Sequence, residues 1–510
     1  MAAKSPNSCL IWAKHEKAEG ERPEAWLPLW MHLEDSLHVS RLLWDNWVPS
    51  SVKRAIFSDL KVSAAEAGIF LAWLAGHHDI GKVSPDFSGR SHVAMDTQTL
   101  YSNLCEAGFS YEENLFMRRG HEMRHESMGA AIMGDTFSDE ELTVLAIIAG
   151  HHGSPVTDGD FSEIAERTDC LTSEWKLSIQ DHRDHVMSLL PSYTFDLVGS
   201  ISKLGIPKRT QVLLTSLVIM SDWLASNSDN FPLLPIATVP AIGEPSIDMQ
   251  ARANSGFAKV TLPAQVEITE LVSPDWNEVF RKRFNLSPEY SLFPAQRELI
   301  DAALEADGPE IFIMEAPMGD GKTEAALLAA EVLLRKGAHG IFVGLPTMAT
   351  TEAMYSRVKP FLASLLEEEG IKGSYSLGHS KAEFSEEYQA DKKVTYSSRR
   401  SQFSQQGWFQ GGKQKALNTF TVGTIDNFLM LSLKAKYAYW RHLGMASKVV
   451  VIDEVHAADE YMVEYLKRSL QWAGFYGCSV ILLSATLPAA VRKDLLEAYS
   501  IGKKAGKEIG

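Results

Sequence analysis

A glycine-rich stretch, Ala316–Thr323, contains the residue types that bind phosphate groups. It follows an apolar run at 311–314 and precedes a helix-like run at 324–334, so the pattern predicts a strand, a tight loop and a helix. Such a loop at a helix N-terminus directs backbone N–H groups and the helix dipole at a phosphate chain. Lys322 is expected to reach the β- and γ-phosphates of a nucleotide, and the hydroxyl of Thr323 to hold Mg²⁺. The residues assigned to the loop are Gly319, Asp320, Gly321, Lys322 and Thr323.

Two carboxylates end a second buried-strand pattern at 447–456, which reads Ser-Lys-Val-Val-Val-Ile-Asp-Glu-Val-His. A near-continuous β-branched run predicts a strand buried on both faces, and ligands bind beyond the carboxyl ends of such strands. Asp453 is expected to bind Mg²⁺, and Glu454 to orient or deprotonate the attacking water. A surface turn with two acids is the alternative. The phosphate loop upstream and another apolar strand at 480–486 favour the site.

These segments resemble the motor core of superfamily 2 helicases over residues 286–510. Gln296 stands where that family reads adenine, and Asp453–His456 matches its Walker B box. The resemblance implies ATP with Mg²⁺ as the ligand of this region. It also implies that two segments touch a nucleic-acid backbone and that a third couples nucleotide state to strand movement. The residues concerned in these three segments are Thr347, Thr424, Ser484 and Thr486.

Histidines recur near the ends of helix-like runs in the first half of the chain. The segments whose side chains could converge on metal ions are 37–39, 76–82, 124–126, 150–153 and 221–223. Imidazole and carboxylate without thiolate suit Fe, Mn, Co, Ni or Zn better than a pure Mg²⁺ site. Two such ions ~3.5–4 Å apart can activate water and stabilise both in-line oxygens of a phosphodiester. A single bridging carboxylate would hold the pair, and Asp79 is the candidate.

Each histidine also has an ordinary interpretation, because a lone residue such as His38 or His125 is more often a core or surface histidine. His78 and Asp79, followed by Gly-Lys, favour the metal interpretation. His77 is interpreted as a neighbour of the site. The histidines interpreted as structural or solvated are His15, His32, His92, His121, His182 and His185.

His78-Asp79 and the surrounding histidines resemble the HD phosphohydrolase superfamily. An HD nuclease followed by a superfamily 2 helicase resembles the CRISPR-associated helicase–nuclease of type I interference systems, and the opening Trp12–Lys14 is most similar to subtype E. The resemblance implies two divalent transition metal ions (Fe, Mn, Co or Ni), held by His38, His78, Asp79, His125, His151, His152 and Asp222. It makes His78 and Asp79 catalytic, with Lys82 beside the scissile phosphate, and places Ser226 near the metal centre.

The elements that must position these residues define a multidomain chain: an all-α HD-type bundle followed by an α/β RecA-like parallel sheet. Helical patterning runs from Leu27 to Ser226, with 64–75 as a clear apolar helix, and a short strand is expected at 9–12. Prolines then interrupt the pattern. The predicted domains are an HD nuclease domain at 1–230, a linker or packing segment at 231–285, and a first RecA-like lobe at 286–510.

Composition fits a globular chain of 510 residues, with 45% hydrophobic and 22% charged residues. The formal net charge of −16 argues against a basic surface that coats nucleic acid, although a local basic groove remains open. No apolar run reaches the ~18 residues of a membrane span. Signal-peptide features are absent, and the four cysteines form no C-x-x-C pair. The expected location is the cytoplasm, without a membrane partner.

The resemblance implies an ATP-driven 3′ to 5′ translocase on single-stranded DNA that cuts the strand at an R-loop formed by an RNA-guided surveillance complex. No second RecA-like lobe fits after Thr486, so this chain is expected to keep the nuclease and to lack an efficient motor. The alternatives are an HD phosphohydrolase for nucleotides and a nucleic-acid remodeller with a structural HD module. Basic and aromatic residues at 375–414 suit either single-strand binding or an exposed insertion.

Overall fold

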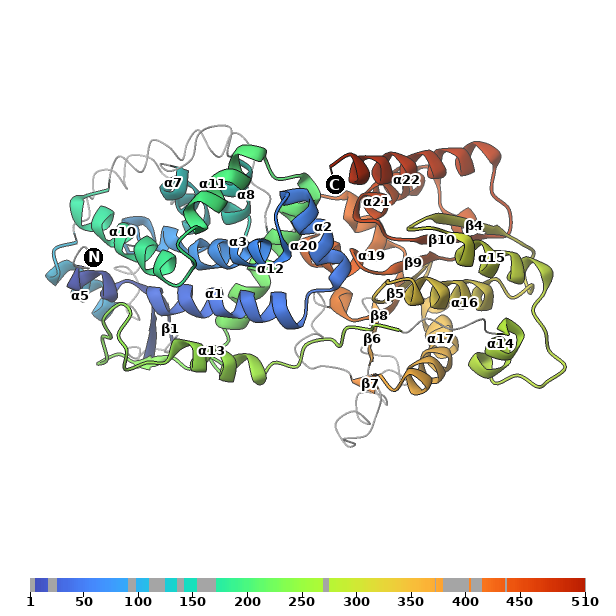
Figure 1. Cartoon of the computed structure of the whole chain (residues 1–510), viewed down its shortest axis with the longest axis horizontal. Coiled ribbons are helices and arrows are strands. Elements are labelled where there is room, and N and C mark those ends of the chain that lie inside the picture. The colour runs from blue at the N-terminus through green and yellow to red at the C-terminus, as the bar shows by residue number, and fades with distance from the viewer. Residues whose placement is uncertain are drawn as a thin grey trace. The chain divides into compact units, whose positions relative to one another are not determined.

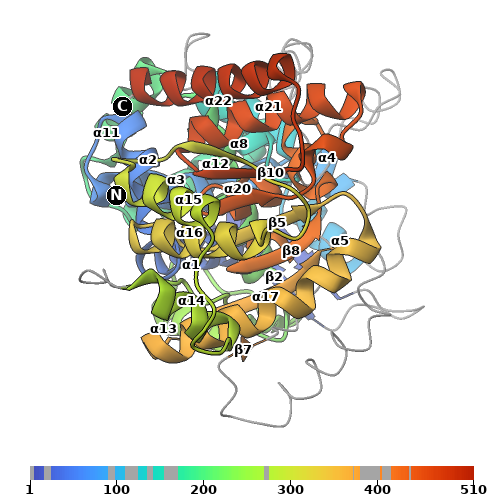
Figure 2. The same cartoon turned by 90° about the vertical axis from the view of Figure 1, so that its right-hand side faces the viewer.

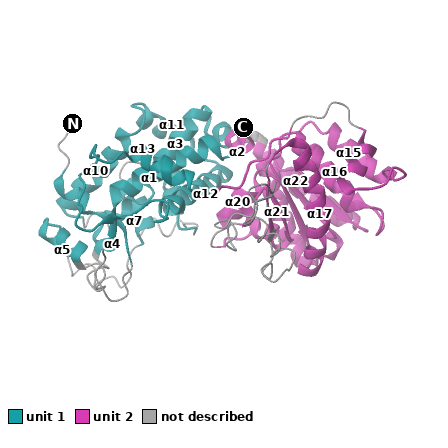
Figure 3. Ribbon diagram, turned by 90° about the horizontal axis from the view of Figure 1, so that it is seen from below, with its two compact units in different colours: residues 1–48, 56–260 teal, residues 49–55, 261–510 magenta. Residues whose placement is uncertain are grey.

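The computed structural model describes residues 5–16, 25–89, 98–109, 124–134, 142–153, 171–268, 275–371, 373–378, 403–404, 415–435 and 438–509. Two compact units divide the chain (Figure 3). Unit 1 comprises residues 1–48 and 56–260, and unit 2 comprises 49–55 and 261–510. The segment 231–285, expected to be a linker, is therefore shared between the two units.

Unit 1 is helical apart from one small sheet. Its helices are α1 (Leu29–Asn46), the C-terminal part of α2 (Ser50–Leu60), α3 (Ala64–His77), α4 (Pro85–Gly89), α5 (Gln98–Glu106), α7 (His125–Gly134), α8 (Leu142–Ala149), α10 (Ser173–Ser188), α11 (Thr194–Leu204), α12 (Lys208–Ala225) and α13 (Met249–Ala258). Two 3-10 turns, η1 (Pro6–Leu10) and η2 (Ile80–Lys82), and three strands, β1 (Trp12–His15), β2 (Ala25–Pro28) and β3 (Leu234–Pro235), complete it.

Helix α1 lies at the centre of unit 1 and packs against α3 and α12 (Figure 1). The apolar pattern at 64–75 forms α3, as the sequence predicts. Ser63 begins this helix with a capping box: its hydroxyl accepts a hydrogen bond from the N–H of Glu66, whose carboxylate accepts one from the N–H of Ser63. At the other end of α3, His78 and Asp79 are both buried in the interior of the unit.

The expected strand at 9–12 is wrong. Pro6 stands at the first position of η1, and Ser5 caps this turn by accepting from the N–H of Asn7, so residues 6–10 form a 3-10 turn. The strand begins at Trp12 and pairs antiparallel with β2, which pairs with β3. The small sheet places Trp12 and the two residues after it beside the helical core.

Unit 2 is an α/β domain. Its helices are α14 (Trp276–Phe284), α15 (Pro294–Glu305), α16 (Lys322–Arg335), α17 (Met348–Glu369), α19 (Asp426–Leu429), α20 (Ala438–Met445), α21 (Glu460–Tyr476) and α22 (Ala489–Ile509). The strands are β4 (Ile311–Glu315), β5 (Ile341–Leu345), β6 (Gly373–Gly378), β7 (Phe403–Ser404), β8 (Phe420–Thr424), β9 (Val449–Ile452) and β10 (Val480–Ser484). Three 3-10 turns are η8 (Lys415–Leu417), η9 (Met430–Ser432) and η10 (Val455–Ala457).

The seven strands form one sheet in the order β4-β10-β9-β5-β8-β6-β7, and all described pairs are parallel. Helices α15, α16 and α17 cover one face, and α21 and α22 cover the other (Figures 1 and 2). Strand β9 is fully buried, which explains its unbroken Val-Val-Val-Ile sequence. The predicted fold class, a helical HD-type bundle followed by a RecA-like parallel sheet, is confirmed.

Two sequence predictions fall largely or wholly outside the described residues: most of the basic and aromatic stretch at 375–414, and both His92 and His121. Among the helices that the structure describes, none is long and apolar enough to cross a membrane.

A buried ionic network joins three helices on one face of the sheet. Glu331 on α16 is fully buried and accepts two hydrogen bonds of 2.8 Å from Arg283 on α14. Arg335, one helical turn further along α16, donates a third of 2.8 Å to the same carboxylate. Arg283 also contacts Glu368 on α17 at 2.5 Å. Glu331 is therefore the central acceptor for two guanidinium groups that water does not reach.

We expect Glu331→Gln to destabilise unit 2 by ~3 kcal/mol or more, because it leaves two buried guanidinium groups without their shared charge. Urea unfolding measures the loss. Glu497→Gln is the matched control, since Glu497 pairs with Lys493 at 3.7 Å between exposed side chains and such pairs contribute about 0–1 kcal/mol. Equal midpoints for the two variants would show that the network contributes no more than a surface pair.

Candidate metal centre and nucleotide loop

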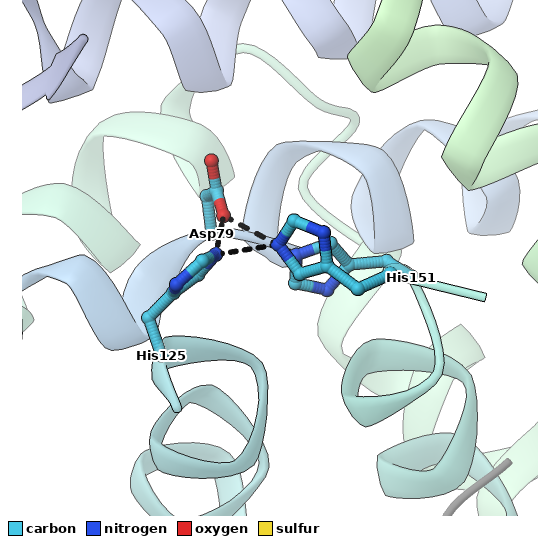
Figure 4. A group of neighbouring side chains, drawn as sticks. Asp79, His125 and His151 are labelled. Atoms are coloured by element: carbon cyan, nitrogen blue, oxygen red, sulfur yellow. Dashed lines mark hydrogen bonds and ion pairs between the residues drawn. The ribbon is translucent and has the colours of Figure 1, made fainter. Parts of the chain in front are cut away.

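The carboxylate of Asp79 lies between two sets of imidazoles and is 2% exposed. Its Oδ1 is 3.2 Å from Nε2 of His125 and 3.3 Å from Nε2 of His151 (Figure 4). Its Oδ2 is 3.1 Å from Nε2 of His32 and 3.4 Å from Nε2 of His78. Each oxygen thus faces its own group of nitrogen atoms, which is the arrangement of a carboxylate that bridges two ions.

Asp222 completes the second set, because its Oδ1 lies 3.2 Å from Nε2 of His32 and 3.5 Å from Nε2 of His78. The first set is completed by His152, whose Nε2 is 2.8 Å from Nε2 of His125. In each set the ligand atoms lie within 4.8 Å of one another. The first group is Asp79, His125, His151 and His152, and the second group is His32, His78, Asp79 and Asp222.

Helix ends bring these residues together. His78 caps the C-terminus of α3, and Asp79 follows it directly as the residue before η2. His125 is the first residue of α7, and His151 follows the end of α8. Asp222 lies in the last turn of α12. Ligands that project from several helices into one interior are a known design for metal sites in helical proteins.

Backbone carbonyls fix the orientation of two rings. Nδ1 of His78 lies 2.7 Å from the carbonyl oxygen of Ala75, and Nδ1 of His151 lies 2.6 Å from that of Ile148. When Nδ1 donates to a carbonyl, Nε2 carries the lone pair that a metal ion needs. Metal-ligating histidines are commonly oriented by such a bond.

The donor atoms fit metal ions on a second, independent ground. Among the residues that the structure describes, four of the buried atoms that face one another in the two groups have no hydrogen-bond partner. They are Nε2 of His32, Nε2 of His78, Nε2 of His151 and Oδ1 of Asp79. Buried polar atoms are normally satisfied, and a group of them that faces one another is typical of ligands that converge on a metal ion.

Electrostatics differ between the two groups. Burial opposes charging of His78, but Asp79 and Asp222 outweigh it and raise the pKa of His78 to about 10. Burial and the neighbouring His151 lower the pKa of His152 to about 4, and burial also lowers the pKa of His125. Although burial opposes ionisation of Asp79, Lys82 and His78 hold its pKa well below the usual range. The surroundings of the first group therefore disfavour protonation of His125 and His152, whereas the two carboxylates favour protonation of His78 in the metal-free chain.

Lys82 contacts the bridging carboxylate directly: its Nζ is 2.6 Å from Oδ2 of Asp79 and 3.1 Å from the carbonyl oxygen of Ala13. The hydroxyl of Ser226 donates to Oδ1 of Asp222 at 3.0 Å. Both residues therefore lie beside the carboxylates of the candidate centre.

The structure places His32, and not His38, in the second group. His38 lies in the middle of α1, and its Nε2 is 3.4 Å from the carboxylate of Glu34, one turn earlier on the same helix. The other oxygen of Glu34 lies 2.8 Å from Nε2 of His185. His38 is outside both groups, and His32, interpreted from the sequence as structural, is a member of the second.

The remaining histidines of unit 1 that the structure describes have local partners. Nδ1 of His77 lies 2.8 Å from the carbonyl oxygen of Trp73, and Nδ1 of His182 lies 2.7 Å from that of Ser178. Nδ1 of His15 lies 2.8 Å from the carbonyl oxygen of Glu16. None of these three belongs to either metal group.

The nucleotide loop connects β4 to α16. Nζ of Lys322 donates to the carbonyl oxygens of Ala316 at 2.7 Å and Pro317 at 3.1 Å. Gln296 accepts from the N–H of Phe293 and donates to the carbonyl oxygen of Gly321, both at 2.9 Å. Gly321 has φ +68°, and a Cβ there would lie 2.3 Å from Nε2 of Gln296, so only glycine suits this position.

The other predicted motor residues follow the carboxyl ends of neighbouring strands. Asp453 comes directly after β9, and burial raises its pKa. Glu454 has φ +54°, and its carboxylate is 3.2 Å from Nδ1 of His456, which lies 3.3 Å from the hydroxyl of Ser484 at the end of β10. Ser484 also donates to the carbonyl oxygen of Thr486 at 2.8 Å. The Walker B segment and the coupling segment are thus in contact through His456.

The two remaining threonines also lie at this edge of the sheet. Thr347, exposed after β5, caps α17 by accepting from the N–H of Thr350 at 3.2 Å, and Thr424 is the last residue of β8. Because parallel strands end on the same side, the structure gathers Thr347, Thr424, Asp453 and Ser484 at one edge. This is the edge where open α/β sheets bind ligands.

Comparison with protein families assigns both halves. A model of the Cas3 HD domain matches residues 12–231, and a model of DEAD/DEAH box helicases matches residues 293–495. The fold and the two sites therefore define an HD-domain protein fused to a DEAD/DEAH box helicase region.

Individual relatives extend the match over nearly the whole chain. The CRISPR-associated nuclease/helicase Cas3 of Streptococcus thermophilus is 35% identical, with 96% of this chain and 53% of the relative aligned. The CRISPR-associated endonuclease/helicase Cas3 of Escherichia coli K12 is 25% identical, with 97% and 56% aligned. The chain belongs to the family of CRISPR-associated Cas3 nuclease/helicases, which confirms the resemblance of an HD nuclease followed by a helicase.

Solved structures agree. T. fusca Cas3 has a TM-score of 0.75 at 27% identity, and the match covers 98% of this chain and 53% of that one. A chain of a CRISPR RNA-guided surveillance complex before nicking has a TM-score of 0.63 at 25% identity, over 97% and 49%. The chain spans about half the length of the relatives that it matches.

We expect Gly81→Ala to disrupt the candidate centre without changing any ligand. A Cβ at Gly81 would lie 1.9 Å from the carbonyl oxygen of His125 and 2.4 Å from the N of Gly129, so α7 must move away from η2. His125 would then withdraw from Asp79. Binding of Mn²⁺, measured by calorimetry, should weaken at least tenfold.

Gly199→Ala is the control for Gly81→Ala: this glycine also lies in unit 1, in helix α11, and no atom lies within 4 Å of the added Cβ. It measures the effect of a substituted glycine on folding alone. Normal Mn²⁺ binding by Gly81→Ala would show that the close approach of η2 to α7 does not position the ligands.

Proposed function

We propose that this chain contains the nuclease and the nucleotide-binding lobe of a protein that degrades foreign DNA in CRISPR defence. The observation that carries the nuclease is the buried carboxylate of Asp79, with its two oxygens directed at separate groups of histidines. Such a pair of sites suits hydrolysis of a phosphodiester. The substrate that we propose is single-stranded DNA, because the Cas3 relatives are described as nuclease/helicases.

The two groups would hold two divalent transition metal ions, one on the His125 side of Asp79 and one on the His32 side. Imidazole with carboxylate favours Fe, Mn, Co or Ni over Mg²⁺ alone. Such ions, when bound, activate a water molecule and stabilise negative charge on the phosphodiester. Lys82 would hold the Oδ2 side of Asp79 and place a positive charge beside the incoming phosphate.

The second unit would bind ATP with Mg²⁺. Lys322 and Thr323 would contact the phosphates and the ion, Gln296 would read adenine, and Asp453 and Glu454 would complete the Mg²⁺ and water sites. We propose that the whole protein moves 3′ to 5′ along a strand exposed by an RNA-guided surveillance complex. The similarity to a chain of such a complex supports this partner. Nuclease activity needs only unit 1 residues, so we propose that this chain retains it.

We expect Asp79→Ala and Lys322→Ala to separate the two activities. Asp79→Ala removes the shared carboxylate, so cleavage of circular single-stranded DNA without ATP should fall at least a hundredfold while nucleotide binding persists. Lys322→Ala should weaken binding of a fluorescent ATP analogue at least tenfold and leave that cleavage unchanged. The assay uses Mn²⁺, Co²⁺, Ni²⁺ or Fe²⁺, with Mg²⁺ alone and EDTA as comparisons.

Asp79→Asn controls for folding, because the amide keeps the shape of the side chain and removes the charge. Loss of both activities from either alanine variant would contradict the two-site proposal. Hydrolysis of free nucleotides in preference to DNA would instead assign unit 1 to a nucleotide phosphohydrolase. A metal-bound unit 1 that cleaves neither substrate would indicate a structural HD module.

Binding of the two ions should depend differently on pH. At neutral pH His78 holds a proton, because its pKa is raised to about 10, and an ion in the second group must displace it. Affinity of that group should therefore rise about tenfold per pH unit from pH 6 to 9. In the first group the pKa of His152 is lowered to about 4 and that of His125 is also lowered, so these ligands are already neutral.

Calorimetric titration with Mn²⁺ at pH 6, 7 and 8 measures both affinities. Repeating it in two buffers of different ionisation enthalpy counts the protons released, which should be about one for the pH-dependent ion and none for the other. Parallel pH dependence of the two ions would contradict the assignment of the proton to His78.

A further inference from the structure

Strand β1 contacts the supports of the candidate metal centre with three successive residues. The ring of Trp12 is 6.2 Å from that of Phe87, which meets the ring of His125 edge-on at 5.6 Å. The carbonyl oxygen of Ala13 accepts the hydrogen bond from Lys82. Nζ of Lys14 donates to the carbonyl oxygen of Ser226 at 2.6 Å. The pairing of β1 shifts register between Trp12 and Lys14, and both side chains contact residues of the helical part of unit 1.

Lys14 acts at the residue that holds Asp222. Ser226 is the C-terminal cap of α12; its N–H donates to the carbonyl oxygen of Asp222 at 2.7 Å, and its hydroxyl donates to Oδ1 of the same residue at 3.0 Å. Oδ1 of Asp222 is the oxygen that faces His32 and His78. Contacts therefore run from Lys14 through Ser226 to a ligand atom of the second group.

The bond between Lys14 and Ser226 is a strong one. A hydrogen bond from an ammonium group is shorter and stronger than one between neutral groups, and a cation is favourable at a helix C-terminus. Lys14 is half-buried, so water competes less for its ammonium group than at an exposed position. This contact ties Ser226, whose hydroxyl donates to Asp222, to strand β1.

Each carboxylate of the candidate centre thus has its own lysine. Lys82 reaches Asp79 directly, and Lys14 reaches Asp222 through Ser226. Because Lys82 also donates to the carbonyl of Ala13, strand β1 joins the two supports. Loss of Lys14 leaves the Lys82–Asp79 contact in place. It removes the support that Lys14 gives to Asp222 through Ser226.

We propose that Lys14 is a positioning residue that fixes the Asp222 side of the metal centre through Ser226. The proposal rests on the proposed metal centre and adds to it that the second group depends on strand β1. An ion held by His32, His78, Asp79 and Asp222 loses affinity when Lys14 is removed. An ion held by His125, His151, His152 and Asp79 keeps its affinity.

If Lys14 only stabilised the end of α12 and had no role at the metal centre, its removal would have a different effect. Removal of Lys14 would then lower the stability of the metal-free chain and weaken both ions together, or neither. The distinguishing readout is therefore the ratio of the two metal affinities rather than cleavage alone.

The experiment is calorimetric titration of Lys14→Met with Mn²⁺ at pH 8, beside the thermal midpoint of the metal-free chain. We expect the second ion to bind at least tenfold more weakly, with the first unchanged and the midpoint close to that of the unmodified chain. Ser226→Ala should give the same selective loss, and the double variant should lose little more than either single one, since both act along one path. Lys14→Arg should restore much of the affinity.

Lys259→Met is the matched control, because Nζ of Lys259 also donates to a backbone carbonyl in unit 1, that of Asp229 at 3.4 Å, and has no part in either group. Equal weakening of both ions in Lys14→Met, or of neither, overturns the proposal for Lys14 and leaves the metal centre intact. Fewer than two ions on the unmodified chain overturns the metal centre and the role of Lys14 with it.

Discussion

A carboxylate buried between two groups of imidazoles is the constraint on which unit 1 depends. Asp79 is 2% exposed, and an unpaired ion at such a site costs several kcal/mol. Lys82 and the four facing imidazoles offset that cost in the metal-free chain. These groups come from different helices, so the ends of α1, α3, α7, α8 and α12 must all reach one point. The helix packing that brings these ends together therefore also supplies the charges and imidazoles that compensate the carboxylate of Asp79.

Much of this could be predicted from the sequence because the informative residues are adjacent along the chain. His78 and Asp79 stand together at the end of a periodic apolar helix, and Asp453 and Glu454 follow an unbroken β-branched run. Local patterns of this kind predict where a residue lies in the fold, because the end of a helix or strand places the next residue at a definite edge of the bundle or sheet. The RecA-like sheet and the order of its motifs follow from the same rule.

His32 could not be separated from His38 by burial, because α1 is buried on nearly every side and both histidines lie inside. The useful signal was the spacing of Glu34 and His38: residues four apart on a helix are neighbours, so this histidine already has a carboxylate. His32 has no carboxylate four residues away, and Asp35, three residues further along, pairs with Arg252. Contacts from distant segments, such as Ala13 with Lys82, have no local pattern and required the structure.

The two sites hold their charges differently before any ligand binds. At the nucleotide loop, Lys322 donates to two carbonyl oxygens of its own loop, which a phosphate would replace as partners. At the metal centre, Lys82 contacts the very carboxylate that an ion would share. A phosphate therefore gains a cation that is already in position, whereas a metal ion must compete with a lysine and with the proton on His78. Occupancy of the metal centre should thus respond to pH and to the choice of metal far more than occupancy of the nucleotide loop does, although both sites are largely preformed.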